Sequence, residues 1–251
     1  MNAATRLDDA QQHREAIPQL DEAVSLADAY RIQHEVLARR HARGERPVGA
    51  KLGFTSRAKM VQMGVSEIIV GQLTDAMLVP DGGSARLGDY IHPRIEPEVA
   101  FRLGADVDPD DPRADVVSAI VAVAPAMEII DSRYKDFSFN LADVVADNTS
   151  AAGFVIGAWQ SFETAGDLGN RAVRMAVDGA ERLAGSTAAI LGHPLTAMAA
   201  LLGLARRYAI PLRAGDIVLA GAATEAIPFA PGHYETRVNA LGSVSVRGLD
   251  G

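Results

Sequence analysis

The chain has 251 residues and a formal net charge of −8, from 24 Lys and Arg against 32 Asp and Glu. This acidic balance argues against a nucleic-acid-binding surface, and the length is sufficient to bury a sizeable core. Because 48% of the residues are hydrophobic and 22% are charged, the composition excludes disorder as the main state. The chain has no Cys, which excludes disulfides, zinc–thiolate sites, iron–sulfur clusters and cysteine nucleophiles. Any metal must therefore bind to oxygen or nitrogen ligands.

The N-terminal residues do not resemble an export signal. They include Asp8 and Asp9 and lack the apolar core that a signal peptide needs. The most apolar stretch, residues 116–130, is interrupted by Pro125 and Glu128 and is shorter than the ~20 residues of a membrane span. We therefore expect a cytoplasmic protein with no membrane and no nucleic-acid partner.

Apolar periodicity predicts two main helices. Residues 25–41 place apolar side chains on one helical stripe, with Ser25 as the N-cap and Gly44 as the stop. The second helix begins near residue 193, where Pro194 suits the first turn, and continues as an apolar stripe. Two more helices are expected at residues 56–63 and 114–124.

From about residue 48 the chain changes to short β-rich runs separated by Gly and Pro. Regular alternation of strands and helices is absent, which argues against Rossmann and TIM-barrel folds. We expect an α+β fold in which an N-terminal helical segment, residues 1–47, precedes a mixed, mostly β body, residues 48–251. The strands are expected at residues 48–54, 98–103, 126–130, 174–177, 216–220 and 235–246.

The most informative residues are two glutamates two positions apart, Glu96 and Glu98. In an extended segment both carboxylates point to the same face. A third carboxylate, Glu128, lies in an otherwise apolar run, where an unpaired charge is costly. Three carboxylates without Cys indicate a hard-oxygen site for Mg²⁺ or Mn²⁺. The alternative is a pair of solvated charges on an exposed strand, and Glu128 weighs against it.

Lys51 and Asp75 are further charged residues in apolar surroundings. A buried lysine can have a lowered pKa and take part in proton transfer, so Lys51 is a candidate catalytic residue. Alternatively, it is a structural lysine that pairs with one of the glutamates. Asp75 is a candidate acid, for which a role in a turn or helix cap is the alternative.

Two polar clusters, at residues 131–133 and 147–150, are candidate substrate-binding segments. An arginine, hydroxyl groups and backbone N–H groups can together bind a substrate carboxylate. Turns and helix caps use the same residue types, so a structural role stays open. The candidate residues are Ser132, Arg133, Asn148 and Ser150.

Six strings of residues, in chain order, carry a family resemblance. They are KLGFTSRAKMVQMGV, PRIEPEVAF, MEIIDSRYKDFSFNLADVVADNTSAAGFVIG, LGHPLTAMAALLG, AGDIVLAGAATEAIPFAPG and LGSVSVRG. Together they resemble the 2-keto-4-pentenoate hydratase and 4-oxalocrotonate decarboxylase family, part of the fumarylacetoacetate hydrolase superfamily. The resemblance extends from about residue 24 to residue 248.

This resemblance implies a mixed β-roll body of the fumarylacetoacetate hydrolase C-terminal type, preceded by helices and associated into a homo-oligomer. It also implies Mg²⁺ or Mn²⁺ and a small 2-oxo-dicarboxylate substrate from meta-cleavage of aromatic rings. The family's metal ligands correspond to Glu96, Glu98 and Glu128. Its active-site lysine corresponds to Lys51 and its active-site acid to Asp75.

The family contains two activities that act in succession. The decarboxylase removes the distal carboxylate of 4-oxalocrotonate (2-oxo-hex-3-enedioate), and the hydratase adds water to the product, 2-hydroxypenta-2,4-dienoate. The strings TSRAKMVQMGV, VPDGG and DSRYKDFSFNL are more similar to the decarboxylase branch, so we expect a decarboxylase, with the hydratase as the alternative. Glu225 stands where the family usually has Gly or Ala, and it would repel a dicarboxylate if it pointed into the pocket.

A hypothesis of another class is a non-catalytic subunit that stabilises a partner hydratase. The resemblance suggests it, because decarboxylases of this family pair with the hydratase that takes their product. A silent subunit has no need of a complete set of site residues. The set that argues against silence is Lys51, Asp75, Glu96, Glu98 and Glu128.

Overall fold

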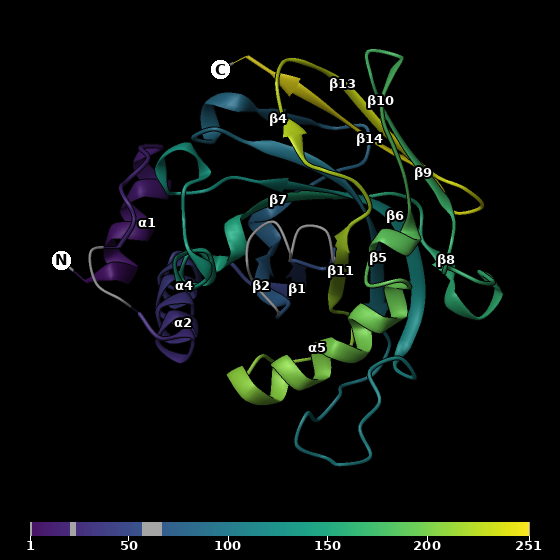
Figure 1. Ribbon diagram of the computed structural model, residues 1–251, viewed down its shortest axis with the longest axis horizontal. Helices are drawn as coiled ribbons and strands as arrows, with labels where there is room; N and C mark the ends of the chain where they lie inside the picture. Colours follow the sequence, from purple (N-terminus) through teal and green to yellow (C-terminus); the bar gives the residue numbers. More distant parts are fainter. Residues whose placement is uncertain (1, 21–23, 57–66, 251) are drawn as a thin grey trace.

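The computed structural model describes residues 2–20, 24–56 and 67–250, which form two β-sheets flanked by helices (Figure 1). The helices are α1 (Ala3–His13), α2 (Leu26–Ala42), α4 (Leu141–Ala146) and α5 (Pro194–Tyr208). The first sheet contains β1 (Pro47–Gly53), β2 (Ile69–Thr74), β3 (Leu78–Val79), β5 (Arg94–Leu103), β6 (Ile120–Ile130), β7 (Ala151–Ile156), β8 (Gln160–Ser161), β11 (Ile217–Ala222) and β12 (Ile227–Pro228). The second contains β4 (Ser84–Arg86), β9 (Ala172–Val177), β10 (Ala180–Ser186), β13 (Gly232–Val238) and β14 (Gly242–Leu249).

The first sheet is rolled up. Its strand order is β2-β1-β11-β5-β6-β7-β3, with β12 beside β5 and β8 beside β6. The strands at the two ends of this order, β2 and β3, are joined by a single 3-10 turn, η1 (Asp75–Met77). Because β3 pairs with β7 while β2 pairs with β1, the sheet must curl until its two edges meet at this turn. The result is a roll with an interior and an exterior face.

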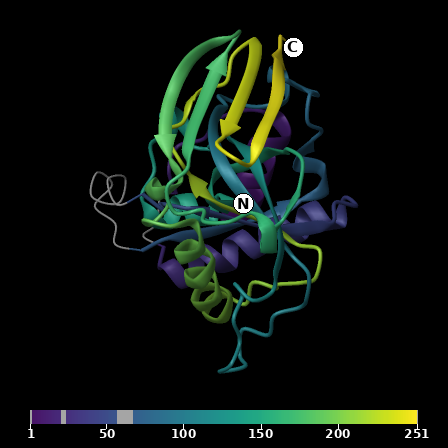
Figure 2. The ribbon, with the colours of Figure 1, turned by 90° about the vertical axis from the view of Figure 1, so that its right-hand side faces the viewer.

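The roll separates three apolar clusters. Its interior holds a small cluster, and its exterior is covered on one side by the second sheet (Figure 2). The remaining exterior face packs against the helices, which supply the largest cluster. Members of the interior cluster include Ala100, Ala126, Phe154 and Leu219.

Helix α5 belongs to the largest apolar cluster. The segment Thr187–Tyr208 is long and apolar enough to cross a membrane, with a mean hydropathy of 1.7. However, Ala197, Met198 and Leu201 on α5 are fully buried against the rolled sheet. The apolar character of this helix is thus explained by core packing. The helix begins where the sequence predicts, with His193 as the N-cap and Pro194 in the first turn.

The N-terminal helices are tied together by one buried carboxylate. Asp8 on α1 accepts hydrogen bonds from Arg39 at 2.8 Å and from both terminal nitrogens of Arg43 at 2.8 and 2.7 Å. Burial raises the pKa of Asp8, but the two guanidinium groups outweigh burial and hold the pKa below its ordinary value. This helical segment also contacts the body, because Ile17 pairs with Tyr134 in an isolated β-bridge.

Several predicted elements are confirmed. The helix expected at residues 25–41 is α2, with Ser25 as its N-cap, and the strand at residues 48–54 is β1. The mixed, mostly β body after an N-terminal helical segment is observed as expected. The run at residues 235–246 forms two strands, β13 and β14, because a turn after Val238 divides it. The helix expected at residues 56–63 falls mainly outside the described residues.

The helix predicted at residues 114–124 is wrong. Residues 116–119 form turns, and strand β6 begins at Ile120. Nine of the eleven residues in β6 are buried, so both faces of this strand are apolar. A strand buried on both faces reads as a continuous apolar run that periodicity does not distinguish from a buried helix.

We predict that Asp8→Asn destabilises the protein by about 2 kcal/mol, less than the ~3–5 kcal/mol of a fully buried pair because the arginines are partly exposed. Chemical denaturation at neutral pH measures this. The matched control is Asp9→Asn, since Asp9 is more exposed and lies 3.9 Å from Arg39. An equal effect of the two variants would contradict the assignment of Asp8 as the tie between α1 and α2.

Candidate metal centre

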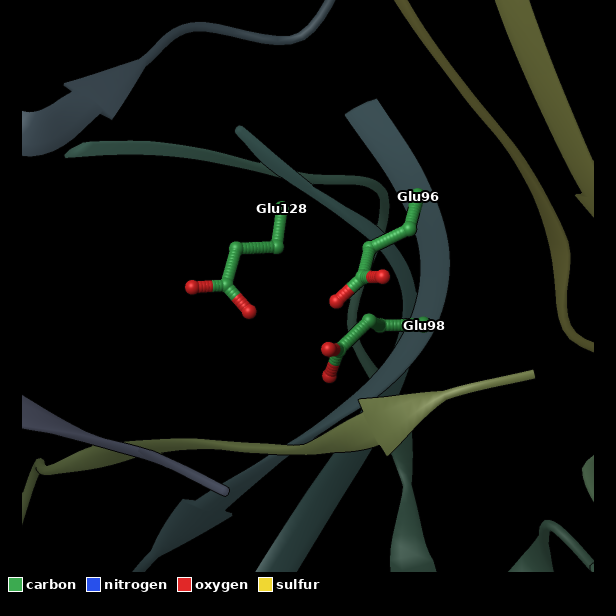
Figure 3. Close-up of side chains that lie close together, drawn as sticks. All are labelled: Glu96, Glu98 and Glu128. Carbon is green, nitrogen blue, oxygen red and sulfur yellow. The ribbon is translucent and has the colours of Figure 1, made fainter. Parts of the chain in front are cut away.

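Three glutamates converge from two neighbouring strands at the interior face of the roll. In the antiparallel register of β5 and β6, Glu96 lies directly opposite Glu128. Glu98 is two residues further along β5, on the same face as Glu96. Ligand oxygens of the three residues lie within 4.8 Å of one another, and their carboxylates turn toward a common space (Figure 3). These three residues form the acidic cluster.

The acidic cluster is buried, which makes its negative charge costly. Glu98 and Glu128 have no exposed surface, and Glu96 is 6% exposed. Burial, together with repulsion from Glu128 and Glu96, raises the pKa of Glu98 well above its ordinary value. Burial also raises the pKa of Glu128 to about 7, against the lowering effect of Lys51. A site that accumulates charge in this way requires a cation to hold all three carboxylates ionised.

One backbone donor reaches the cluster through a local distortion of β11. The N–H of Gly221 donates to Oε2 of Glu98 at 2.8 Å. The register of β11 against β5 shifts between Leu219 and Ala222, and Gly221 there has a φ of 113°. A Cβ on Gly221 would lie 2.0 Å from Oγ1 of Thr55, so no larger residue fits. The glycine therefore allows the bulge that turns this N–H toward Glu98.

Lys51 enters the same space from the opposite wall of the roll. Its Nζ lies 3.0 Å from Oε1 of Glu128 and donates to the carbonyl oxygen of Thr149 at 3.0 Å. Burial lowers the pKa of Lys51, but attraction to Glu128, Glu96 and Glu98 outweighs it, so the pKa is raised. Lys51 is therefore cationic, not the neutral amine that burial alone would favour. The pairing with one of the glutamates, which is the structural alternative for Lys51, is observed, and a catalytic role stays a prediction.

The donor set fits a divalent metal ion. Oε1 of Glu98 and Oε2 of Glu128 are buried, and neither has a hydrogen-bond partner within the described part of the chain. Unsatisfied carboxylate oxygens that share one space are the ligands that Mg²⁺ and similar hard cations prefer. Lys51 supplies one positive charge against three carboxylates, so a dication would bring the cluster close to neutrality. Glu96, Glu98 and Glu128 would hold it.

A strained turn, η4 (Asn148–Ser150), completes the site. All three of its residues have positive φ, from 48° to 57°. The side chain of Asn148 holds the turn against β2, since it accepts from the N–H of Gln72 at 2.8 Å and donates to that residue's carbonyl at 2.9 Å. Oγ of Ser150 and Oγ1 of Thr149 are buried with no partner among the described residues. Strain of this kind, beside unsatisfied hydroxyls, is typical of a functional site.

The other predicted substrate-binding residues are engaged within the protein. Arg133 is buried, and its guanidinium donates to the carboxylate and backbone carbonyl of Asp147 and to the carbonyl of Ala151. Oγ of Ser132 accepts from the N–H of Tyr134 at 3.1 Å. The side-chain amide of Asn148 is hydrogen-bonded to the backbone of Gln72 on β2. Only Ser150 retains a free hydroxyl, and substrate binding by these four residues stays a prediction.

Asp75 lies apart from the acidic cluster. It sits in turn η1, where its carboxylate accepts from the backbone N–H and the Nε of Arg46, both at 2.9 Å. The backbone N–H bond from Arg46, followed by its side chain, lowers the pKa of Asp75. These contacts join the start of β1 to the turn that closes the roll. They support the structural alternative, and catalysis by Asp75 stays a prediction.

Two parts of the site have no local sequence signal. The carbonyl of Thr149 that holds Lys51 and the N–H of Gly221 that holds Glu98 are backbone groups. Their positions depend on a strained turn and on a bulge, each far from its partner in the chain. Glu225, which the sequence marked as a possible obstacle to an anionic substrate, is exposed in the segment between β11 and β12.

A rolled sheet with helices, enclosing three glutamates and a lysine, fits the class of β-roll proteins with a divalent-metal site in the interior of the roll. Comparison with known families agrees. The chain matches the fumarylacetoacetate (FAA) hydrolase C-terminal family over residues 42–246. The chain belongs to this family.

The relatives of this chain include both decarboxylases and hydratases. The chain is 49% identical over 245 residues to a 4-oxalocrotonate decarboxylase from Pseudomonas sp., covering 96% of this chain and 95% of that protein. It is 38% identical over 246 residues to a 2-keto-4-pentenoate hydratase from Burkholderia vietnamiensis, covering 96% and 94%. Among solved structures, the 4-oxalocrotonate decarboxylase from Pseudomonas putida G7 complexed with magnesium and adipate has a TM-score of 0.91 at 38% identity, covering 98% and 95%.

We predict that Mg²⁺ or Mn²⁺ raises the thermal stability of the protein, by about 2.7 kcal/mol when the free metal is 100-fold above its Kd. Glu98→Gln should lose this increase, because it removes a ligand. Without metal it should be at least as stable as the wild type, since a buried like charge is removed. Differential scanning fluorimetry with and without metal measures both effects.

The control for this experiment is Glu163→Gln, because Glu163 is exposed in turn η5 (Phe162–Thr164). Its metal-induced increase in melting temperature should equal that of the wild type. An undiminished increase in the Glu98→Gln protein would show that the metal binds elsewhere.

Metal affinity should also depend on pH. Glu128, with a pKa of about 7, is mostly protonated at pH 6 and mostly ionised at pH 8, and only the ionised form is a ligand. We therefore expect Mg²⁺ to bind about tenfold more weakly at pH 6 than at pH 8. The metal-free protein should show the opposite trend in stability, because an acid with a raised pKa costs free energy once ionised. Calorimetry at the two pH values tests this, and equal affinities would contradict it.

Proposed function

We propose that this protein is a metal-dependent decarboxylase that converts 4-oxalocrotonate (2-oxo-hex-3-enedioate) to 2-hydroxypenta-2,4-dienoate. The observation that carries the proposal is the buried acidic cluster, with two carboxylate oxygens left without donors beside a cationic lysine. Its support in sequence is the greater identity to the decarboxylase than to the hydratase. The cofactor is Mg²⁺ or Mn²⁺, held by Glu96, Glu98 and Glu128.

The reaction needs an acceptor for one electron pair. The C5–C6 bond of the substrate breaks and C6 leaves as CO₂. The bonding pair becomes the C4=C5 bond, the C3=C4 pair moves between C2 and C3, and the C2 oxygen takes the negative charge. Protonation of that oxygen gives 2-hydroxypenta-2,4-dienoate. A divalent cation bound at the acidic cluster would supply positive charge where this oxygen becomes negative.

In this proposal Lys51 acts at the 2-oxo end of the substrate. Its Nζ is fixed between Glu128 and the carbonyl of Thr149, so little reorganisation is needed when charge develops at the C2 oxygen. As a cation, Lys51 can polarise the carbonyl and hold the proton that this oxygen receives. The free hydroxyl of Ser150 is the other polar group that we assign to substrate positioning.

The alternative within the same family is a 2-keto-4-pentenoate hydratase. That reaction starts from the dienol and requires one group to protonate the far carbon and another to activate water. Among the site residues described, Lys51 and the glutamates are the titratable groups, and both chemistries could use them. The observation that favours this alternative is the similarity of the chain to 2-keto-4-pentenoate hydratases.

We also propose a cellular location and an assembly state for the protein. As a relative of enzymes of aromatic meta-cleavage, the protein would work in the cytoplasm as a homo-oligomer, with a hydratase as a possible partner for its product. A non-catalytic subunit of such a complex would not need a buried cluster with raised pKa values, because burying charge costs stability.

The direct test is CO₂ release from 4-oxalocrotonate, with parallel ultraviolet absorbance, in the presence of Mg²⁺ and then EDTA. We expect CO₂ only with metal, and a loss of at least ~100-fold in kcat for Glu128→Gln. Glu163→Gln serves again as the control with unchanged rates.

Three outcomes would revise the proposal. Absence of CO₂ together with consumption of 2-hydroxypenta-2,4-dienoate would assign the hydratase. Absence of both reactions, combined with activation of a separate hydratase, would assign a non-catalytic subunit. Full CO₂ release in EDTA would remove the metal from the mechanism.

A further inference from the structure

A pocket of about 550 Å³ opens at the end of β5 that carries the acidic cluster. It lies between the start of β5, strand β12 and turn η3 (Lys135–Phe137). Residues that line it include His92, Arg94, Asp136, Phe137 and Phe229. These five residues define the mouth pocket.

Strand alternation places Arg94 on the same face of β5 as the metal ligands. Arg94, Glu96 and Glu98 are successive alternate residues of one strand. With a rise of about 3.3 Å per residue, the Cα atom of Arg94 lies about 6.6 Å from that of Glu96. Arg94 is exposed, whereas Glu96 and Glu98 are buried, so the strand passes from the metal site to the outside. Arg94 is thus the next side chain outward from the acidic cluster on that strand.

The guanidinium of Arg94 is held against an aromatic ring but has no carboxylate partner among the described residues. It stacks over the ring of Phe137 at 4.6 Å from the ring centroid. No ion pair between Arg94 and a carboxylate occurs among residues 2–20, 24–56 and 67–250. Most exposed arginines in the described part of the chain have such a partner, as Arg46 does with Asp75. A stacked guanidinium retains its in-plane N–H donors for a ligand.

The rest of the mouth pocket is arranged around the same ring. The ring of His92 packs against that of Phe137 in a tilted arrangement, with 4.8 Å between centroids, and its Nε2 lies 2.7 Å from the carbonyl oxygen of Ser132. Asp136 is an acidic member of the pocket, and it is exposed, so water screens its repulsion of an anion. Phe229 gives the pocket an apolar wall. The pocket therefore offers one guanidinium with an aromatic support, next to a metal site.

We propose that Arg94 binds the distal carboxylate of the substrate and thereby selects dicarboxylic over monocarboxylic 2-oxo acids. This rests on the proposed function, in which the 2-oxo acid end of the substrate occupies the acidic cluster. An extended six-carbon chain with its first carboxylate at the cluster directs its last carboxylate outward along β5. Arg94 is a specificity-determining residue in this arrangement.

The ion pair should affect substrate binding more than turnover. The distal carboxylate loses its charge as CO₂ forms, so an ion pair with Arg94 stabilises the bound substrate more than the transition state. We expect Arg94→Met to raise KM for 4-oxalocrotonate about tenfold while kcat stays the same or increases. A purely structural role would instead lower kcat and the melting temperature together.

The decisive experiment measures binding and needs no turnover. In the presence of Mg²⁺, calorimetry compares 2-oxoadipate with 2-oxohexanoate, which share the 2-oxo acid and differ only in the distal group. The wild type should bind 2-oxoadipate about tenfold more tightly, as expected for one charge-assisted pair. Arg94→Met should abolish this preference, and Asp136→Asn should increase it.

Arg102→Met is the matched control, because Arg102 is an exposed arginine at the far end of the same strand and also stacks on an aromatic ring, that of Trp159 at 5.1 Å. It should keep the wild-type preference. A preference that survives Arg94→Met, or its absence in the wild type, overturns the role of Arg94 but leaves the metal site intact. Failure of both ligands to bind in the presence of Mg²⁺ would instead overturn the proposed function.

Discussion

The structure depends on the burial of three carboxylates and one ammonium group inside a rolled sheet. Unpaired, each charge in this interior would be costly, and the raised pKa values of Glu98 and Glu128 express that cost. Lys51 offsets part of it through its ion pair with Glu128. Because the compensation is incomplete, a divalent cation would stabilise the ionised cluster. The same electrostatic imbalance would thus weaken the metal-free fold and favour metal binding.

Closure of the roll makes this interaction possible. Lys51 is on β1 and Glu128 is on β6, and in the sheet these strands are separated by β11 and β5. Their side chains meet only because the sheet curls until β3 reaches β7. The pair formed by Asp75 and Arg46 lies at the turn where this closure occurs.

In the proposed arrangement, the solvent exposure of the charged groups increases from the acidic cluster outward to Arg94. At its inner end the carboxylates are buried, and a strained turn presents the carbonyl of Thr149 to Lys51. At its outer end Arg94 is exposed and supported by an aromatic ring. Charge at the buried end is held in fixed geometry, which suits bond-making chemistry. Charge at the exposed end is screened by water, which suits recognition and release of an anionic group.

The sequence by itself determined the type of fold, the helix capped by Ser25, the helix that starts at Pro194, and the residue types of the acidic cluster. These features depend on local patterns or on spacings within one element, as with Glu96 and Glu98 on one strand face. The sequence misled at residues 114–124, because a strand buried on both faces has no period of its own. Only the tertiary structure decided that Glu128 lies opposite Glu96 and that Lys51 reaches Glu128. It also decided that Arg133 pairs with Asp147, whereas Arg94 has no ionic partner among the described residues. The physical reason is that strand register and roll closure bring together groups distant in the chain, and no local propensity encodes those distances.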